Sequence, residues 1–176
     1  MAIKIVEIRN PDELKKTHAG INSLIKTLSE EDQHMLGLKK NEHDYLHPAQ
    51  YKYITKRWVL KDGDKIVGFF DLLADGKPMY GNVIICVAPW MRDKGWGDKL
   101  CETGSSWVDQ HIKRFNNVIL ACLSENKQSH ALAKKYGWKR YKDRDEDRPG
   151  VGHFDAYIKT PATVIVKEIF DSIELK

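Results

Sequence analysis

The sequence predicts a single α/β (α+β) domain built around a mixed β-sheet. Segments with strand-like patterns alternate with segments of helical spacing, in the order strand, helix, three strands, helix, strand, helix, two strands. The strand–helix–strand path across residues 82–123 requires a crossover, which makes that pair of strands parallel. A chain of 176 residues is long enough for one domain with a complete core.

The N-terminal segment begins with a strand over residues 3–9, where isoleucines alternate with charged residues. Asn10-Pro11-Asp12-Glu13 is a helix start, with Asn as the N-cap and Pro in the first turn. An apolar face extends this helix over about 11–29. Residues 30–55 are polar and rich in histidine, and they predict only a short helix around 48–54 that covers an edge of the core.

Three antiparallel strands follow. Arg57 to Leu60 and Lys65 to Leu73 form a hairpin, because Asp62-Gly63 between them is a strong turn signal. A second turn at 75–78 leads into a strand over about 79–88, where β-branched residues predict burial.

The remaining elements are a helix over about 96–113, a strand over 117–123, a helix that ends before Gly137, a strand over about 138–143, a charged loop over 144–153 and a strand over 154–159. Thr160-Pro161 then opens a further helix. Ile165, Ile169 and Ile173 line one face of it. We therefore expect a domain over residues 1–160 and a helical extension over 161–176 that packs on the domain or forms a homodimer contact.

The turn between the strand ending near Val87 and the next helix has the character of a phosphate site. Gly95 and Gly97 leave its backbone open to close approach by a large group. The first amides of the helix lack internal partners and face the positive end of the helix dipole. Arg92 and Lys94 add positive charge. Such a turn is suited to holding phosphate oxygens.

The complete string, Val87-x-Pro89-x-x-Arg92-x-x-Gly95-x-Gly97-x-x-Leu100, resembles the acetyl-CoA motif of the GNAT superfamily of N-acetyltransferases. A second string, Asn126-x-x-Ser129-x-x-Leu132-x-x-x-x-Gly137-Trp138, is similar to the other signature of that superfamily. The two strings and the strand order extend the resemblance over about residues 55–160. The resemblance implies a sheet whose two central strands splay apart, with the cofactor entering between them.

The resemblance also implies the cofactor-binding residues. The strand edge from Cys86 through Val87 to Ala88 would offer backbone groups to the pantetheine arm, and an amide near Val87 would stabilise the thioester oxygen. The pyrophosphate would lie on the turn formed by Arg92, Asp93, Lys94, Gly95, Trp96 and Gly97, which we call the phosphate turn. Asn126 and Ser129 would reach the pantetheine arm, although Asn126 also fits a simple helix N-cap.

Direct attack of an amine on the thioester needs a base for the amine and an acid for the departing thiolate. At the position where relatives carry the acidic tyrosine, this chain has Ala133. Tyr136 and His130 are the candidate acids. The alternative interpretation makes Tyr136 an aromatic residue at the edge of the core and His130 a surface residue. The strand before the phosphate turn has no carboxylate, so Asp71 on the preceding strand is the candidate base, with a water chain as the alternative.

The function predicted is acyl transfer from acetyl-CoA to an amine acceptor in a ternary complex. A catalytically weak CoA-binding regulatory or interaction module on the same fold remains the alternative, because the usual acid and base are displaced. A net charge of +4 suits an anionic cofactor and does not favour nucleic acid. The sequence leaves open whether the acceptor is a small amine, a protein or an aminoacyl group.

Cysteine and histidine usage predicts a cytoplasmic protein without a metal centre. The three cysteines, Cys86, Cys101 and Cys122, are widely spaced and indicate reduced thiols. Cys86 reads as a small buried hydrophobe, not as a nucleophile. His43 and His47 have helical spacing for a metal but no evident third ligand. No apolar run approaches the length of a membrane span, and the N-terminus does not read as a signal peptide.

Overall fold

The computed structural model describes residues 2–39, 52–76 and 79–161. Eight strands form one sheet in the order β1-β2-β3-β4-β5-β8-β6, with β7 also pairing with β8. The strands are β1 (Ile3–Ile8), β2 (Ile54–Asp62), β3 (Lys65–Asp75), β4 (Met79–Val87), β5 (Phe115–Leu123), β6 (Lys139–Arg140), β7 (Glu146–Arg148) and β8 (Gly152–Lys159). Among these described strands, β4 and β5 are the one parallel pair. The predicted mixed α/β sheet is confirmed.

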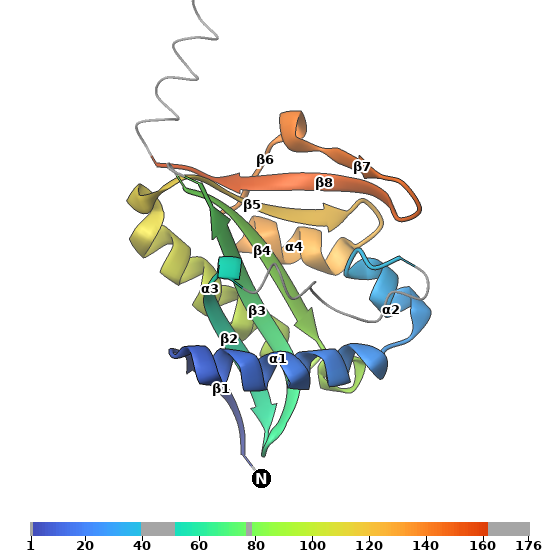
Figure 1. Ribbon diagram of the computed structural model, residues 1–176. Helices are drawn as coiled ribbons and strands as arrows, with labels where there is room; N and C mark the ends of the chain where they lie inside the picture. Colours follow the sequence, from blue (N-terminus) through green and yellow to red (C-terminus); the bar gives the residue numbers. More distant parts are fainter. Residues whose placement is uncertain (1, 40–51, 77–78, 162–176) are drawn as a thin grey trace, which may run out of the picture.

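The α-helices of the described chain are α1 (Pro11–Lys26), α2 (Glu30–Met35), α3 (Trp96–His111) and α4 (Lys127–Lys135), with short 3-10 turns at Pro89–Met91, Ile112–Arg114 and Lys142–Arg144. Helix α1 lies on one face of the sheet, and α3 and α4 lie on the other (Figure 1). On the α1 face, Ile21 and Ile25 pack with Phe69. On the opposite face, Leu100 and Ala133 belong to a second buried cluster.

The N-terminal helices differ from the expectation of one helix over 11–29. Helix α1 starts as predicted, since the side chain of Asn10 accepts a hydrogen bond from the Glu13 amide at 2.8 Å. The helix ends at Lys26, and a separate helix α2 begins after Ser29, whose hydroxyl caps the Asp32 amide at 3.1 Å. The sequence pattern does not predict α2, which is important here because its residues line the candidate site.

Two further segments differ from the structure expected for them. The loop expected over 144–153 contains the short strand β7 and the start of β8. In the predicted helix at 48–54, Ile54 instead begins β2, while residues 48–51 lie outside the described residues. Residues 162–176 also lie outside them, so the C-terminal helix and the homodimer contact stay predictions.

A buried ion pair joins β2 and β3 beneath α1. Arg57 donates from Nε to Asp71 Oδ1 at 2.7 Å and from Nη2 to Asp71 Oδ2 at 2.5 Å. Both side chains have no exposed surface. Arg57 Nη1 also donates to the Leu14 carbonyl oxygen at 3.2 Å, which ties the pair to α1. Two parallel hydrogen bonds between ionised groups are a strong and directional contact.

Close packing of α3 on the sheet depends on Gly104. A Cβ atom at this position would lie only 2.5 Å from the Cε1 and Cε2 atoms of Phe70, whose ring is fully buried. Helix α3 therefore approaches β3 as closely as a residue without a side chain permits. The contact fixes the depth of α3, and with it the position of the phosphate turn at its N-terminus.

Gly104→Ala is expected to destabilise the folded protein by up to about 2 kcal/mol. Overpacking costs roughly 1–3 kcal/mol, and the better helix propensity of alanine returns about 1 kcal/mol of that. Urea unfolding followed by circular dichroism measures the difference. Ser106→Ala, at an exposed position of the same helix, is the matched control and is expected to be neutral or slightly stabilising. A stabilised Gly104→Ala protein would contradict the tight packing.

Candidate active site

The centre of the candidate site is the point where β4 and β5 separate. Their parallel pairing runs from Met79 with Phe115 to Val83 with Leu120 and stops there. Beyond it, β4 continues to Val87 while paired with β3, and β5 continues to Leu123 while paired with β8. The last residues of β4 therefore form an open strand edge inside the sheet, as the resemblance implied.

Backbone groups of β4 point into this opening. The Ala88 amide donates to the Val67 carbonyl oxygen at 2.8 Å, so Ala88 directs its amide towards β3. Hydrogen-bonded and non-hydrogen-bonded pairs alternate along antiparallel strands. Cys86 therefore faces β3 as well, while Ile85 and Val87 direct their amide and carbonyl groups away from β3, towards the opening. An unpaired strand edge of this kind can bind an extended chain through main-chain hydrogen bonds.

The turn after β4 brings the N-terminus of α3 to the same opening. Gly95, with φ of 79°, precedes the first residue of α3 and has no side chain to cap the first amides. Asp93 also has a positive φ of 59°, which is uncommon for a residue with a side chain. A Cβ at Gly97 would meet only the side chain of Val87 at 3.6 Å. The turn thus presents backbone amides with little side-chain cover.

A pocket of about 620 Å³ occupies the space between these elements. Its walls come from the end of β4, the phosphate turn, the first turn of α3, the turn between β5 and α4, α4 itself and α2. The lining residues used below are Glu31, Asp32, Met35, Leu36, Ile85, Cys86, Val87, Arg92, Asp93, Gly95, Gly97, Asp98, Glu125, Asn126, Lys127 and Ser129. This volume is in the range of pockets that bind cofactors and small ligands.

Most of the predicted cofactor residues line this pocket. Those in the lining are Cys86, Val87, Arg92, Asp93, Gly95, Gly97, Asn126 and Ser129. Ala88, Lys94 and Trp96 are not among the lining residues. Ala88 is fully buried, and the ring of Trp96 instead contacts the ammonium group of Lys99. Asn126 is the N-cap of α4, and its side chain accepts a hydrogen bond from the Ser129 amide at 3.2 Å.

Helix α2 connects the two sides of the pocket. On one side, Arg92 of the phosphate turn donates from Nη2 to Asp32 Oδ1 at 2.6 Å. On the other, His34 Nε2 lies 3.1 Å from Oε1 of Glu125, in the turn before α4. The Glu125 pKa lies below its usual range because its carboxylate accepts from its own backbone amide and from His34. Neither contact can be predicted from the sequence, because each joins segments far apart in the chain.

The predicted catalytic residues all lie outside the pocket lining. Asp71 is held in the buried pair with Arg57 described above. The Tyr136 hydroxyl donates to Asp98, which lines the pocket. The ring of His130 has Nδ1 at 2.7 Å from the Tyr157 hydroxyl and Nε2 at 3.1 Å from the Leu123 carbonyl oxygen.

The cysteine in the pocket has the properties of a buried hydrophobe. Cys86 is 8% exposed, and burial raises the pKa of its thiol to about 12. A nucleophilic cysteine needs a substantial thiolate fraction near neutral pH. The raised pKa therefore agrees with the interpretation made from the sequence. All three cysteines are free and buried.

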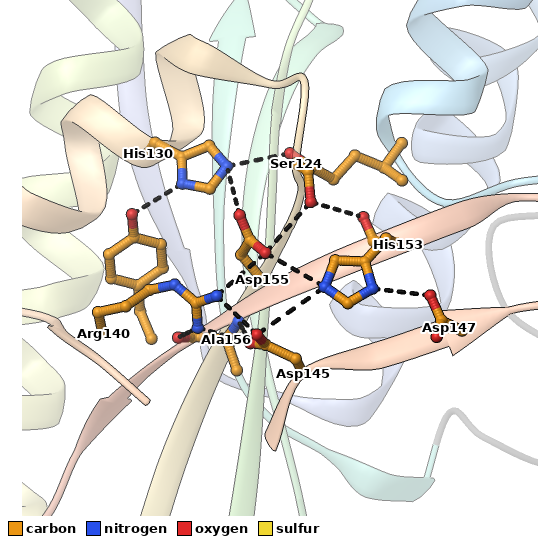
Figure 2. Close-up of polar contacts among 10 residues, drawn as sticks. Ser124, His130, Arg140, Asp145, Asp147, His153, Asp155 and Ala156 are labelled. Atoms are coloured by element: carbon orange, nitrogen blue, oxygen red, sulfur yellow. Dashed lines mark hydrogen bonds and ion pairs between the residues drawn. The ribbon is translucent and has the colours of Figure 1, made fainter. Parts of the chain in front are cut away.

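A polar network lies beside His130, on β8 and its neighbours (Figure 2). Arg140 donates to Asp145 at 2.5 Å and to Asp155 at 3.0 Å, and this pairing lowers the pKa of Asp145 to about 2. His153 Nδ1 lies 2.7 Å from Asp147 Oδ1. Asp145, His153 and Asp155 are close enough to share a metal ion, but Arg140 already compensates both carboxylates.

His153→Gln is expected to be less stable than the wild type at acidic pH and about as stable as the wild type at alkaline pH. The hydrogen bond to Asp147 and the charges of Asp155 and Asp145 raise the pKa of His153 above its ordinary value of 6.5. Stability from the protonated ring is therefore complete below that value and is lost as the pH rises through the folded-state pKa. Urea unfolding of both proteins at about pH 5.5 and about pH 8.5 measures the difference in their free energies of unfolding. An equal difference at both values would contradict this assignment.

Comparison with known families agrees with this geometry. The family model described as "Acetyltransferase (GNAT) family" matches residues 21–138. The chain belongs to the GNAT acetyltransferase family. No curated protein sequence matches it. None of the described helices has the length and apolar character needed to cross a membrane.

Solved structures share the fold at low sequence identity. A GNAT-family acetyltransferase from Streptococcus pneumoniae is 18% identical, with a TM-score of 0.61 over 90% of this chain and 98% of that one. A ribosomal-protein-S5-alanine acetyltransferase from Vibrio fischeri is 12% identical, with a TM-score of 0.66 over 91% and 93%. Spermidine N-acetyltransferase from Vibrio cholerae, in complex with CoA and spermine, is 15% identical, with a TM-score of 0.59 over 89% and 94%.

Proposed function

We propose that this protein is an N-acyltransferase that moves the acetyl group of acetyl-CoA to an amine by direct attack in a ternary complex. The observation that carries the proposal is the open edge of β4 next to the N-terminus of α3. One feature offers main-chain groups to an extended arm, and the other offers amides to phosphates. Both belong to one pocket large enough for such a ligand. Three free, buried cysteines are compatible with the cytoplasmic location proposed from the sequence.

Two sets of backbone amides of the chain take part in the proposed reaction. The amides of Gly97 and its neighbours in the first turn of α3 hold the pyrophosphate. The amides of Ile85 and Val87 face the opening, where one of them stabilises the negative charge that develops on the thioester oxygen. Acetyl-CoA supplies the activated thioester. The neutral acceptor amine attacks the carbonyl carbon and forms the new carbon–nitrogen bond, and its nitrogen gives up a proton to a water chain. The carbon–sulfur bond breaks, and the thiolate takes up a proton.

Calorimetric titration with acetyl-CoA, followed by release of free CoA thiol in the presence of an amine panel, tests this function. The panel contains a polyamine, a peptide with a free N-terminus and an amino acid amide. Micromolar binding together with amine-dependent thiol release is the expected result. Binding without thiol release for any amine would favour the alternative, a CoA-binding interaction module. The displaced acid and base favour that alternative.

Tyr136→Phe is expected to lower kcat by about 10² with unchanged affinity for acetyl-CoA, because general acid catalysis contributes at least that much. Of the three candidate catalytic residues, Tyr136 is the one whose hydroxyl contacts a lining residue, Asp98. His130→Gln is the comparison, since both nitrogens of that ring face Tyr157 and Leu123. Thiol release at saturating acetyl-CoA measures kcat. An unchanged kcat in Tyr136→Phe would indicate that solvent, and not Tyr136, protonates the thiolate.

A further inference from the structure

The charges around the pocket are unusual for a phosphate site. Carboxylates predominate in the lining, where Glu31, Asp32, Asp93, Asp98 and Glu125 stand against the cations Arg92 and Lys127. A carboxylate near a phosphate opposes binding unless another group compensates it, because like charges brought together cost several kcal/mol. The protein therefore needs cations directed at its own carboxylates before it can accept a pyrophosphate.

The pair of Asp32 and Arg92 meets this need at the phosphate turn. The Asp32 carboxylate is held at both oxygens, with Oδ1 accepting from Arg92 Nη2 at 2.6 Å and Oδ2 accepting from the Ser29 hydroxyl at 3.0 Å. The Asp32 side chain is 17% exposed and that of Arg92 is 34% exposed. Both line the pocket, so the pair is fixed in place and partly withdrawn from water.

We propose that Arg92 serves mainly as the counter-ion of Asp32, and that this pair, rather than a direct contact between Arg92 and phosphate, sets the affinity of the site for the CoA pyrophosphate. The proposal rests on the proposed cofactor. It makes Asp32, on a helix that precedes the cofactor motif by about 60 residues, a positioning residue for that motif. The backbone amides of the phosphate turn then carry the direct recognition of phosphate.

The two roles for Arg92 predict different results when both residues are replaced. If Arg92 neutralises Asp32, then Arg92→Ala exposes a carboxylate to the pyrophosphate and weakens binding. Removing the carboxylate as well then restores binding. If Arg92 binds phosphate directly, the double variant stays as weak as Arg92→Ala. When one member of a close charge pair is truncated, much of the loss in affinity comes from the other charge, which is left unpaired.

The experiment is calorimetric titration of CoA into four proteins: wild type, Asp32→Asn, Arg92→Ala and the double variant. We expect Arg92→Ala to bind about 30-fold more weakly, and the double variant to return to within about 3-fold of wild type. Asp32→Asn alone is expected to change affinity by no more than about 3-fold. Arg9→Ala, at an exposed position directly after the edge strand β1, controls for net charge.

A second ligand separates this role from a purely structural one. S-Acetyl-pantetheine has no pyrophosphate, and its affinity is expected to be the same for all four proteins. If the pair only held α2 in place, affinity for this ligand would fall with that for CoA, because Met35, the last residue of α2, and Leu36, the residue after it, line the pocket. Such a result, or a double variant as weak as Arg92→Ala, would overturn the inference. Failure of the wild type to bind CoA would overturn the proposed function with it.

Discussion

Asp71→Asn is expected to destabilise the folded protein by about 3–5 kcal/mol. The substitution leaves the guanidinium of Arg57 fully buried without its carboxylate, and breaking a buried pair from one side is among the most costly single changes. Urea unfolding at about 25 °C measures the free energy of unfolding. A loss of this size is a large fraction of the 5–15 kcal/mol that stabilises an ordinary domain.

The double variant Arg57→Met/Asp71→Leu separates the cost of the unpaired charge from that of lost packing. Replacing a buried ion pair by apolar side chains of similar size is often neutral, so the double variant is expected to be more stable than Asp71→Asn. Activity of Asp71→Asn at low temperature, where it stays folded, tests the role as a base. If Asp71→Asn had wild-type stability and a strongly reduced kcat, the buried pair would not be the main role of Asp71.

Gly97→Glu is expected to weaken acetyl-CoA binding by at least about 100-fold while the fold is retained. The new carboxylate would stand at the N-terminus of α3, inside the pocket, where the pyrophosphate is proposed to lie. A negative charge in the first turn of a helix favours the helix itself, by about 0.3–1 kcal/mol. Binding and stability should therefore change in opposite directions. Calorimetry with acetyl-CoA and a thermal melt of the same samples measure both.

Two controls divide this effect into charge and space. Ser106→Glu places the same charge on an exposed position of α3 and is expected to leave affinity unchanged. Gly97→Ala adds only a Cβ, which meets Val87 at an ordinary 3.6 Å, so stability should not fall through a clash. Tight acetyl-CoA binding by Gly97→Glu would show that the pyrophosphate lies elsewhere.

Local patterns predicted the elements that depend on local causes. The cap at Asn10, the turn at Asp62-Gly63 and the end of α4 before Gly137 each follow from the residue itself and its immediate neighbours, and all appear in the structure. The parallel pairing of β4 and β5 was predictable because a crossover leaves no other choice. The expected cofactor residues came from the resemblance to the GNAT motifs, and most of them line one pocket.

The misses have a common physical origin in short elements and long-range contacts. Helix α2 has six residues, too few for a helical period, although Ser29-x-x-Asp32 is a capping signal that was present in the sequence. The ion pair of Asp71 with Arg57 could not be predicted, because the strand register that places these residues opposite each other appears only in the folded sheet. The pairing of Arg92 with α2 is likewise set by tertiary structure alone.

The inward-facing amides at the end of β4 have a consequence for mutational studies. Changing a side chain at Ile85 or Val87 leaves the amide and carbonyl in place. An alanine scan of this strand would therefore report on the packing of these side chains against the core and not on the backbone groups on which the proposed chemistry depends. Proline at position 87, or an ester in place of that amide, removes the donor itself. Such backbone substitutions are the informative probes of this strand.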